Sequence, residues 1–157
     1  MEVTPLPSKN TTYEEIYERF GRKVTDFDLA EMLNLDDEET QQFVAQMLFG
    51  YLEASIAKFK KCATDLSDRN DEAGEFNSTL EEIEKEILAM MMVTEWLEPQ
   101  LNSTLYTSQF FGTKEQKFYA QANQLDKLMT LKNTNEVKTR KLMRDYTYRN
   151  IATFLEG

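Results

Sequence analysis

Carboxylates are the commonest groups in this sequence that could do chemistry, and several stand close together. The chain of 157 residues holds 28 Asp and Glu against 18 Lys and Arg, for a formal net charge of −10. The polar run 65–78 has the acids of a calcium loop. Counted from Asp68, however, it places Ala73 where such a loop requires Gly and Thr79 where it requires a bidentate Glu. The pattern therefore predicts a polar loop and no metal ligands.

The absence of histidine excludes most familiar active sites. A Ser-His-Asp triad, a Cys-His pair and a His-containing zinc or di-iron site all need a residue that this chain lacks. Neither glycine-rich phosphate-binding motif, GxxxxGK(S/T) or GxGxxG after a strand, occurs. The densest carboxylate cluster is expected on the solvated face of a helix (Glu81, Glu82, Glu84 and Glu86). We therefore predict no catalytic residues, no metal and no cofactor, and a protein that is not an enzyme.

Cys62 is the one cysteine, so it has no partner for an internal disulfide, which suits a reducing compartment. Because it stands beside Phe59 in a helical pattern, we expect a small buried hydrophobic residue rather than a nucleophile. The run MEVTPLPSKN at the start lacks the basic and apolar segments of a signal peptide. The longest apolar run, 87–93, is too short to span a bilayer, so no membrane partner is expected.

The elements that hold these residues are predicted from apolar spacing. Apolar residues recur at helical intervals, and only five Gly and three Pro interrupt the chain, so we predict an all-α fold. Gly21 and Pro99 are expected to end helices. Capping-box sequences mark four helix starts (Thr12, Asp36, Ser78 and Thr113). The prediction is a bundle of two short and three long helices in one domain over 12–146 (about 13–20, 26–33, 37–64, 79–98 and 114–146).

Three segments are predicted outside the helices: an extended N-terminal arm (1–11), a connection (99–113) and a C-terminal docking tail (147–157). The connection and the tail carry aromatic and apolar residues that a core of this size does not absorb. Met90 to Met92 stand in consecutive positions, so either one reaches a second surface or the helix is buried on all sides. We expect a partner or subunit interface formed by nine residues (Leu105, Tyr106, Phe110, Phe111, Tyr146, Tyr148, Ile151, Phe154 and Leu155).

Charge is distributed unevenly along the chain. Residues 114–157 hold nine Lys and Arg against five Asp and Glu, a net +4, so the preceding 113 residues carry −14. A basic end on an acidic body can match an acidic partner or the acidic body of the next identical subunit. The alternative is a solvated helix face of mixed charge. The acidic balance disfavours binding of free nucleic acid by the surface as a whole.

The stretch 87–148 carries a pattern of its own. A helix ends in the unit Trp-Leu-Glu-Pro (96–99), and a loop with small polar residues and aromatics follows (102–111). The next helix opens with Phe-Tyr-x-x-Ala-Asn-Gln-Leu (118–125), and Tyr146 and Tyr148 stand near its end. This pattern resembles the helical head-to-tail adaptor (connector, or neck) proteins of tailed bacteriophages. It contains no catalytic motif, and the N-terminal 35 residues lie outside it.

The resemblance implies a structural virion protein that is assembled in the host cytoplasm. It implies an all-α protein that forms a homo-oligomeric ring, a dodecamer, joining the portal protein to a tail or neck protein, with no sequence-specific contact to nucleic acid. The alternative hypothesis is a soluble acidic regulatory or inhibitor protein that binds one cellular partner, of which an acidic mimic of DNA is a variant. A third is an enzyme that uses carboxylates alone.

Overall fold

The structure is a computed structural model that describes residues 9–24, 37–110 and 115–156, with side chains over all of these except 104–122 and 152–156. Within these residues the chain is mostly helical, with one short antiparallel hairpin, so the all-α prediction is confirmed in its coarse form. The elements are α1 (Tyr13–Lys23), α3 (Glu38–Lys58), β1 (Arg69–Asn70), β2 (Glu75–Phe76), α4 (Glu82–Phe110) and α5 (Glu115–Glu156). The predicted helix 26–33 and arm residues 1–8 lie outside the described part.

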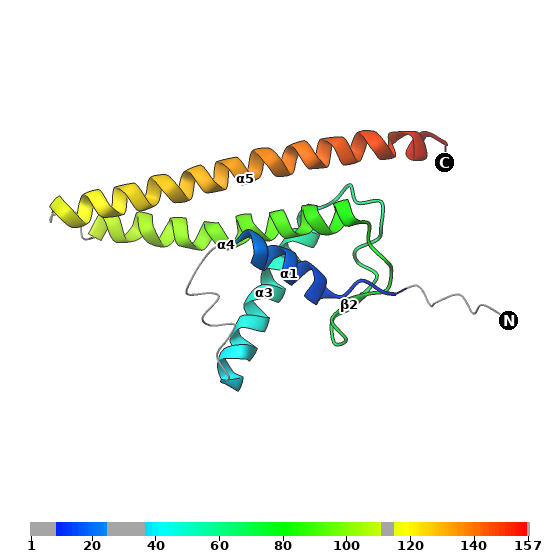
Figure 1. Cartoon of the computed structure of the whole chain (residues 1–157), viewed down its shortest axis with the longest axis horizontal. Coiled ribbons are helices and arrows are strands. Elements are labelled where there is room, and N and C mark those ends of the chain that lie inside the picture. The colour runs from blue at the N-terminus through cyan, green and yellow to red at the C-terminus, as the bar shows by residue number, and fades with distance from the viewer. Residues whose placement is uncertain (1–8, 25–36, 111–114, 157) are drawn as a thin grey trace.

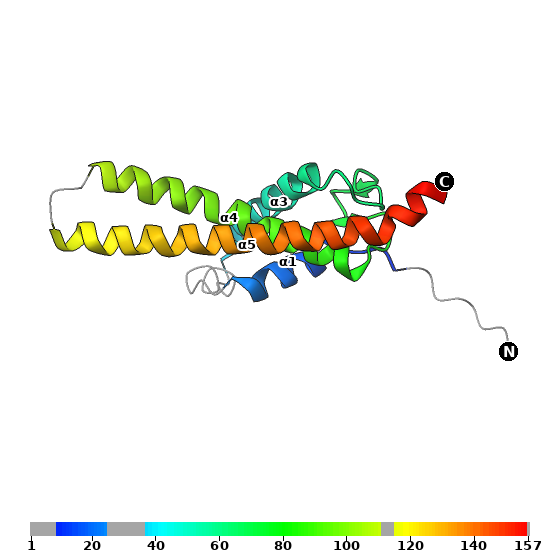
Figure 2. The same cartoon turned by 90° about the horizontal axis from the view of Figure 1, so that it is seen from above.

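Helix α4 is the central element. It forms a long antiparallel pair with α5, and α1 and α3 pack against it on the side away from α5 (Figures 1 and 2). This position explains the Met triplet. Met90 and Met92 are buried and Met91 is half-buried, as are their neighbours on most of the helix circumference. The second alternative for the triplet, a helix buried on all sides, therefore describes this stretch.

Helix α1 begins at the capping box that the sequence predicts. The Thr12 Oγ1 accepts from the backbone N–H of Glu15, and the Glu15 carboxylate accepts from the backbone N–H of Thr12 at 2.8 Å. Its apolar face, Ile16 and Phe20, is fully buried against α3 and α4. Phe20 contributes ring contacts to Tyr51 and Trp96, which join the three helices around one core.

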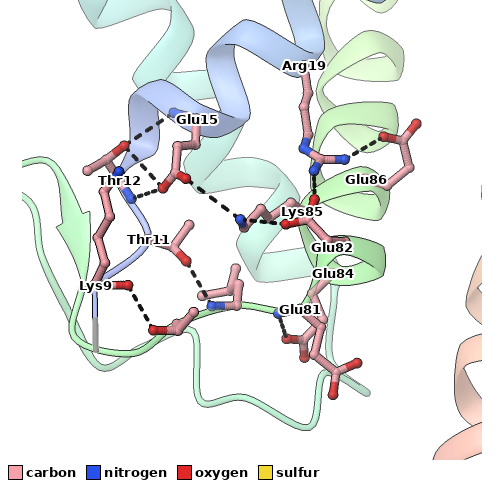
Figure 3. A network of polar contacts seen from close by, with 12 residues as sticks. Lys9, Thr11, Thr12, Glu15, Arg19, Glu81, Glu82, Glu84, Lys85 and Glu86 are labelled. Carbon is pink, nitrogen blue, oxygen red and sulfur yellow. Dashed lines mark hydrogen bonds and ion pairs between the residues drawn. The ribbon is translucent and has the colours of Figure 1, made fainter. Parts of the chain in front are cut away.

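A belt of charged side chains joins α1 to the first turns of α4 (Figure 3). Arg19 pairs with Glu82 and, at 3.1 Å, with Glu86. Lys85 is almost completely buried and lies between Glu82 at 3.1 Å and Glu15 at 3.7 Å. These ion pairs hold α1 in a fixed register on α4, because Arg19 of α1 contacts two carboxylates of α4, and Lys85 of α4 contacts one carboxylate on each helix.

Helix α5 packs on α4 through residues spaced alternately three and four apart, the spacing of a coiled-coil seam. They are buried or half-buried (Leu125, Leu128, Lys132, Asn135, Thr139, Leu142 and Tyr146). The Asn135 Nδ2 donates to the Met90 carbonyl oxygen at 2.7 Å and to Thr94 Oγ1 at 2.8 Å. The stretch 133–136 is polar, a composition that can mark a kink or a solvent-bridging segment of a helix. In this structure the stretch is continuous helix, and the hydrogen bonds of Asn135 fix how α5 aligns with α4.

Two predicted helix ends are wrong. Helix α1 continues through Gly21 to Lys23, because the packed Phe20 and the Lys23–Glu86 ion pair hold its last turn on α4. Helix α4 continues through Pro99 to Phe110. Proline removes one backbone hydrogen bond, but Leu97 and Leu101 are buried on either side of it and keep the helix packed on its partner.

The other boundaries change with these. The predicted connection 99–113 is helix up to Phe110, and the predicted tail 147–157 is the continuation of α5 to Glu156. Helix α3 ends at Lys58 rather than near 64, because the Phe59 side chain turns inward and is buried. Its N-cap is Asp37, one residue after the predicted cap. The polar loop 65–78 contains the β1–β2 hairpin, whose turn places Gly74 at φ 68°, a conformation that favours glycine.

Candidate partner-binding surface

Helix α5 carries large apolar side chains that its packing on α4 leaves in solvent. A helix that only covers a core buries its apolar stripe and exposes polar residues. Here the exposed residues include apolar ones on several faces (Met129, Leu131, Val137, Tyr148 and Ile151). Val137, Tyr148 and Ile151 share the side turned away from α4, since their positions differ by near-whole turns of the helix. Exposed apolar side chains of this kind on one element are typical of a surface that binds another protein.

The nine residues predicted for an interface are placed differently from one another. Tyr148 is 68% exposed and Ile151 is also exposed, as the prediction requires. Tyr146 is 1% exposed, so its prediction as an interface residue is wrong: its side chain packs inside this chain. Leu105, Tyr106 and Phe110 belong to α4, and Phe154 and Leu155 to α5, but these side chains and all of Phe111 lie outside the described part.

A groove lies between the C-terminal end of α3 and the last part of α5. Its volume is about 600 Å³. The α5 wall uses positions i, i+3, i+4, i+7, i+8 and i+11 from Arg140, which form one stripe of a helix. The groove has an apolar floor (Met143, Tyr148 and Ile151) and five cationic side chains around it (Lys58, Lys60, Lys61, Arg140 and Arg144). We call this surface the basic groove.

Most of the cations in the basic groove have no carboxylate partner among the residues that the structure describes. Lys58 pairs with Glu95 of α4, and this hydrogen bond is the main cause that raises the pKa of its ammonium group. No other described residue forms an ion pair with the remaining four (Lys60, Lys61, Arg140 and Arg144). On a chain of net charge −10, this concentration of uncompensated positive charge favours binding of an anionic group.

The charge changes sign along the same seam. A second hollow of about 300 Å³ adjoins the basic groove and shares Lys58, Arg140 and Met143 with it. Its further walls carry carboxylates from α4 and α5 (Glu95, Glu98 and Glu136). An occupant that extended into both hollows would therefore meet cations at one end and acids at the other, which fixes its direction.

A carboxylate is buried where the start of α4 meets α5 and the segment after α3. Glu84, on the first turn of α4, is 0% exposed and has no cationic partner among the described residues. Its two oxygens accept from five groups: the Tyr146 hydroxyl at 2.7 Å, the backbone N–H of Glu81 at 2.8 Å, the Thr64 hydroxyl at 2.9 Å, the Cys62 thiol at 3.0 Å and the backbone N–H of Thr64 at 3.4 Å. The prediction that this carboxylate lies on a solvated face is therefore wrong. We call this group the Glu84 cluster.

The donors around Glu84 keep it charged. Burial by itself raises the pKa of Glu84, and the hydrogen bonds from Cys62, the Glu81 N–H, Tyr146 and Thr64 together outweigh burial and hold that pKa below its usual value. Burial, and then the hydrogen bond to Glu84, raises the pKa of the Cys62 thiol to about 12. A thiol with so high a pKa is protonated at neutral pH and is a poor nucleophile.

Tyr146 joins three parts of the chain: α5, the start of α4 and the segment after α3. Its hydroxyl donates to Glu84 at 2.7 Å and accepts from the backbone N–H of Ala63 at 2.7 Å, and its ring contacts that of Phe59 edge to face at 5.5 Å. The cluster thereby fixes α5 against the start of α4 and the segment after α3. This segment includes Lys60 and Lys61, which also line the basic groove.

Sequence reasoning missed several of these residues. Glu84 stands four residues after Leu80 and three before Ile87, which are both buried. Its place on this apolar stripe could have predicted that it is buried too. Arg140 and Arg144 are four residues apart on one helix face, but their approach to Lys60 depends on how two distant helices pack. Among the described residues, no three His, Cys, Asp or Glu side chains come together as a metal site. None of the helices, over the same described residues, combines the length and apolar character that crossing a bilayer requires.

Comparisons with family models, with curated proteins and with solved structures found no match to this chain. The geometry of its own residues and the pattern over 87–148 therefore carry the functional argument.

Proposed function

We propose that this chain is an assembly protein that acts by binding other protein chains and itself, as a ring-forming adaptor. The observation that carries this proposal is the exposed apolar surface on α5, above all Val137, Tyr148 and Ile151. Burying such side chains against another chain removes apolar area from water, which is the main driving force of association. In this proposal the chain performs no catalysis.

The resemblance of residues 87–148 to tailed-bacteriophage adaptors suggests the setting. There the protein would form a homo-oligomeric ring in the virion, between the portal protein and a tail or neck protein. The α4–α5 pair suits this role, because a helix of 42 residues, about 63 Å long, offers contacts to several neighbours at once. Its stiffness comes from the coiled-coil seam, so the exposed side chains are presented in a fixed geometry.

The first test is the mass of the native assembly. Native mass spectrometry and sedimentation velocity of the full chain should show one closed stoichiometry that dissociates on dilution. A variant with Val137→Ser and Tyr148→Ser should weaken self-association about tenfold or more, because it removes apolar area from the proposed contact. The matched control changes polar residues of the same helix, Thr130→Ser and Asn133→Ser, and should assemble as the wild type does.

Two outcomes would contradict the proposal. A chain that stays monomeric at high concentration, alone and in a lysate that contains portal and tail proteins, is not a ring-forming adaptor. If that monomer instead forms a stoichiometric complex with one cellular protein, and charge reversal at Glu38 and Glu39 abolishes the complex, the acidic regulatory or inhibitor hypothesis replaces it.

A further inference from the structure

The basic groove has a complementary surface on the same chain. Helix α3 begins with three exposed acids, and one turn later presents Phe43, which is 59% exposed. Glu39 and Phe43 are four residues apart and therefore share one helix face. We call this surface the acidic tip and define it as Asp37, Glu38, Glu39 and Phe43. No described residue forms an ion pair with its three carboxylates.

The tip and the groove are complementary in charge, and each also carries apolar side chains. The groove offers uncompensated cations around an apolar floor, and the tip offers uncompensated acids around an exposed aromatic ring. An aromatic side chain inserted in a pocket and surrounded by polar contacts is the common form of an interface hot spot. The volume of about 600 Å³ exceeds what one aromatic side chain fills, so the groove has room for Phe43 and part of its helical turn.

The two surfaces cannot meet within one chain. The groove lies at the C-terminal end of α3, and the tip lies at its N-terminal end. A helix of 21 residues separates them by about 30 Å. Figure 1 shows the start of α3 pointing away from α5, on the far side of α4. A contact between tip and groove therefore has to join two chains.

We propose that the acidic tip of one copy docks in the basic groove of the next copy. This inference rests on the proposed function and names the two surfaces that carry the self-association. Because the two surfaces are different, the contact is heterologous and generates a ring if the rotation closes, or a filament if it does not. Phe43 is the anchor in the apolar floor, and Glu38 and Glu39 face Lys60, Lys61 and Arg144.

The experiment is a charge exchange between two full-length variants. The groove variant carries Lys60→Glu and Arg144→Glu, and the tip variant carries Glu38→Lys and Glu39→Lys. Each variant alone brings like charges together at every contact, so its self-association should weaken about tenfold or more. Mixed in equal amounts, the two should assemble again, because the acidic groove of one now meets the basic tip of the other, while the remaining contact is the natural one.

Matched controls reverse the same number of charges elsewhere. Arg22→Glu with Lys127→Glu, and Glu14→Lys with Glu18→Lys, change exposed residues outside both surfaces and should assemble as the wild type does. Phe43→Ser tests the anchor without any change of charge, and Ala45→Ser, exposed on the same helix, is its control. Phe43→Ser should weaken association about tenfold or more, and Ala45→Ser less than about twofold.

The outcomes separate this inference from the proposed function. If the wild type assembles and the mixed variants do not regain assembly, docking of tip in groove is wrong while the assembly function stands. If the wild type never self-associates, both fail. If the groove variant assembles normally but loses binding to an acidic protein or to a nucleic acid, the groove has another occupant and the inference is overturned.

Discussion

Tyr146 and Tyr148 stand two residues apart on α5 and have opposite environments. Tyr146 is 1% exposed, and its hydroxyl donates to Glu84 and accepts from the Ala63 N–H. Tyr148 is 68% exposed and contributes to the floor of the basic groove. The same short segment thus packs one tyrosine into the fold and leaves the other in solvent, where we propose that it binds a partner. The comparison teaches that an aromatic-rich helix end can have one face that packs in the core and another that lies in solvent.

The largest expected effect is on the buried side of this comparison. Glu84→Ala removes the carboxylate that accepts from the Tyr146 and Thr64 hydroxyls, so the free energy of unfolding should fall by about 3 kcal/mol or more. Urea denaturation of the variant measures it. The matched control is Glu82→Ala on the same turn, an exposed ion-paired residue, which should cost no more than about 1 kcal/mol. Equal losses in the two variants would show that Glu84 has no special role.

Acidification should act through the same carboxylate. The folded pKa of Glu84 is lowered, so its contribution to stability is fully present above the unfolded pKa of about 4.3 and is lost as pH falls through the lower folded value. The difference in unfolding free energy between wild type and Glu84→Gln should therefore shrink by about half or more between roughly pH 6 and pH 3. Because Glu15, Glu86, Asp65 and Asp71 titrate in both proteins, the difference isolates Glu84. A constant difference over this range would contradict the prediction.

Removal of one oxygen distinguishes the two tyrosines. Tyr146→Phe deletes the hydroxyl that joins Glu84 to the Ala63 N–H and should lower the free energy of unfolding by about 1–2 kcal/mol. Tyr148→Phe is the matched control, and its hydroxyl forms no hydrogen bond with another described residue, so it should change stability by less than about 0.5 kcal/mol. Thermal denaturation of the two variants side by side makes the comparison, and similar shifts would contradict it.

The smallest effect on stability is expected for a substitution in the basic groove, which should instead weaken self-association. Tyr148→Ala should change the free energy of unfolding by about 0.5 kcal/mol or less, since the side chain is mostly in solvent. It should nevertheless weaken self-association, measured by sedimentation, about tenfold, because an exposed aromatic residue in a contact is a strong anchor. A variant that lost stability and kept its association would reverse the roles assigned to the two tyrosines.

The fold class followed from local patterns, and the helix ends did not. Apolar spacing predicts helices wherever it continues, and the Thr12–Glu15 capping box begins α1 as expected. Gly21 and Pro99 were expected to end helices on local grounds. Each costs a helix about 1–3 kcal/mol, and the burial of Phe20 in α1 and of Leu97 and Leu101 in α4 offsets that cost. Such burial depends on which helix lies opposite, so it cannot be predicted from a short window of sequence.

The candidate surface was predicted only in part for the same reason. Tyr148 and Ile151 were predicted as interface residues and are exposed, but Tyr146 was assigned with them and is buried. Two residues along a helix correspond to a rotation of about 200°, so Tyr146 and Tyr148 point to opposite sides of α5. Which of them faces α4 depends on which side of α5 forms the seam. That side is set by Asn135 and its bonds to α4, 11 residues earlier on the same helix.

By itself, the sequence determined the all-α class, the start of α1, the lack of histidine chemistry and the split between an acidic body and a basic end. These properties depend on composition and on contacts within a few residues. The tertiary structure decided that Glu84 is buried, that Tyr146 is structural, and that Lys60 and Arg144 line one groove. Each of these depends on residues 20 to 90 positions apart, and only packing of α3, α4 and α5 brings them close together in space.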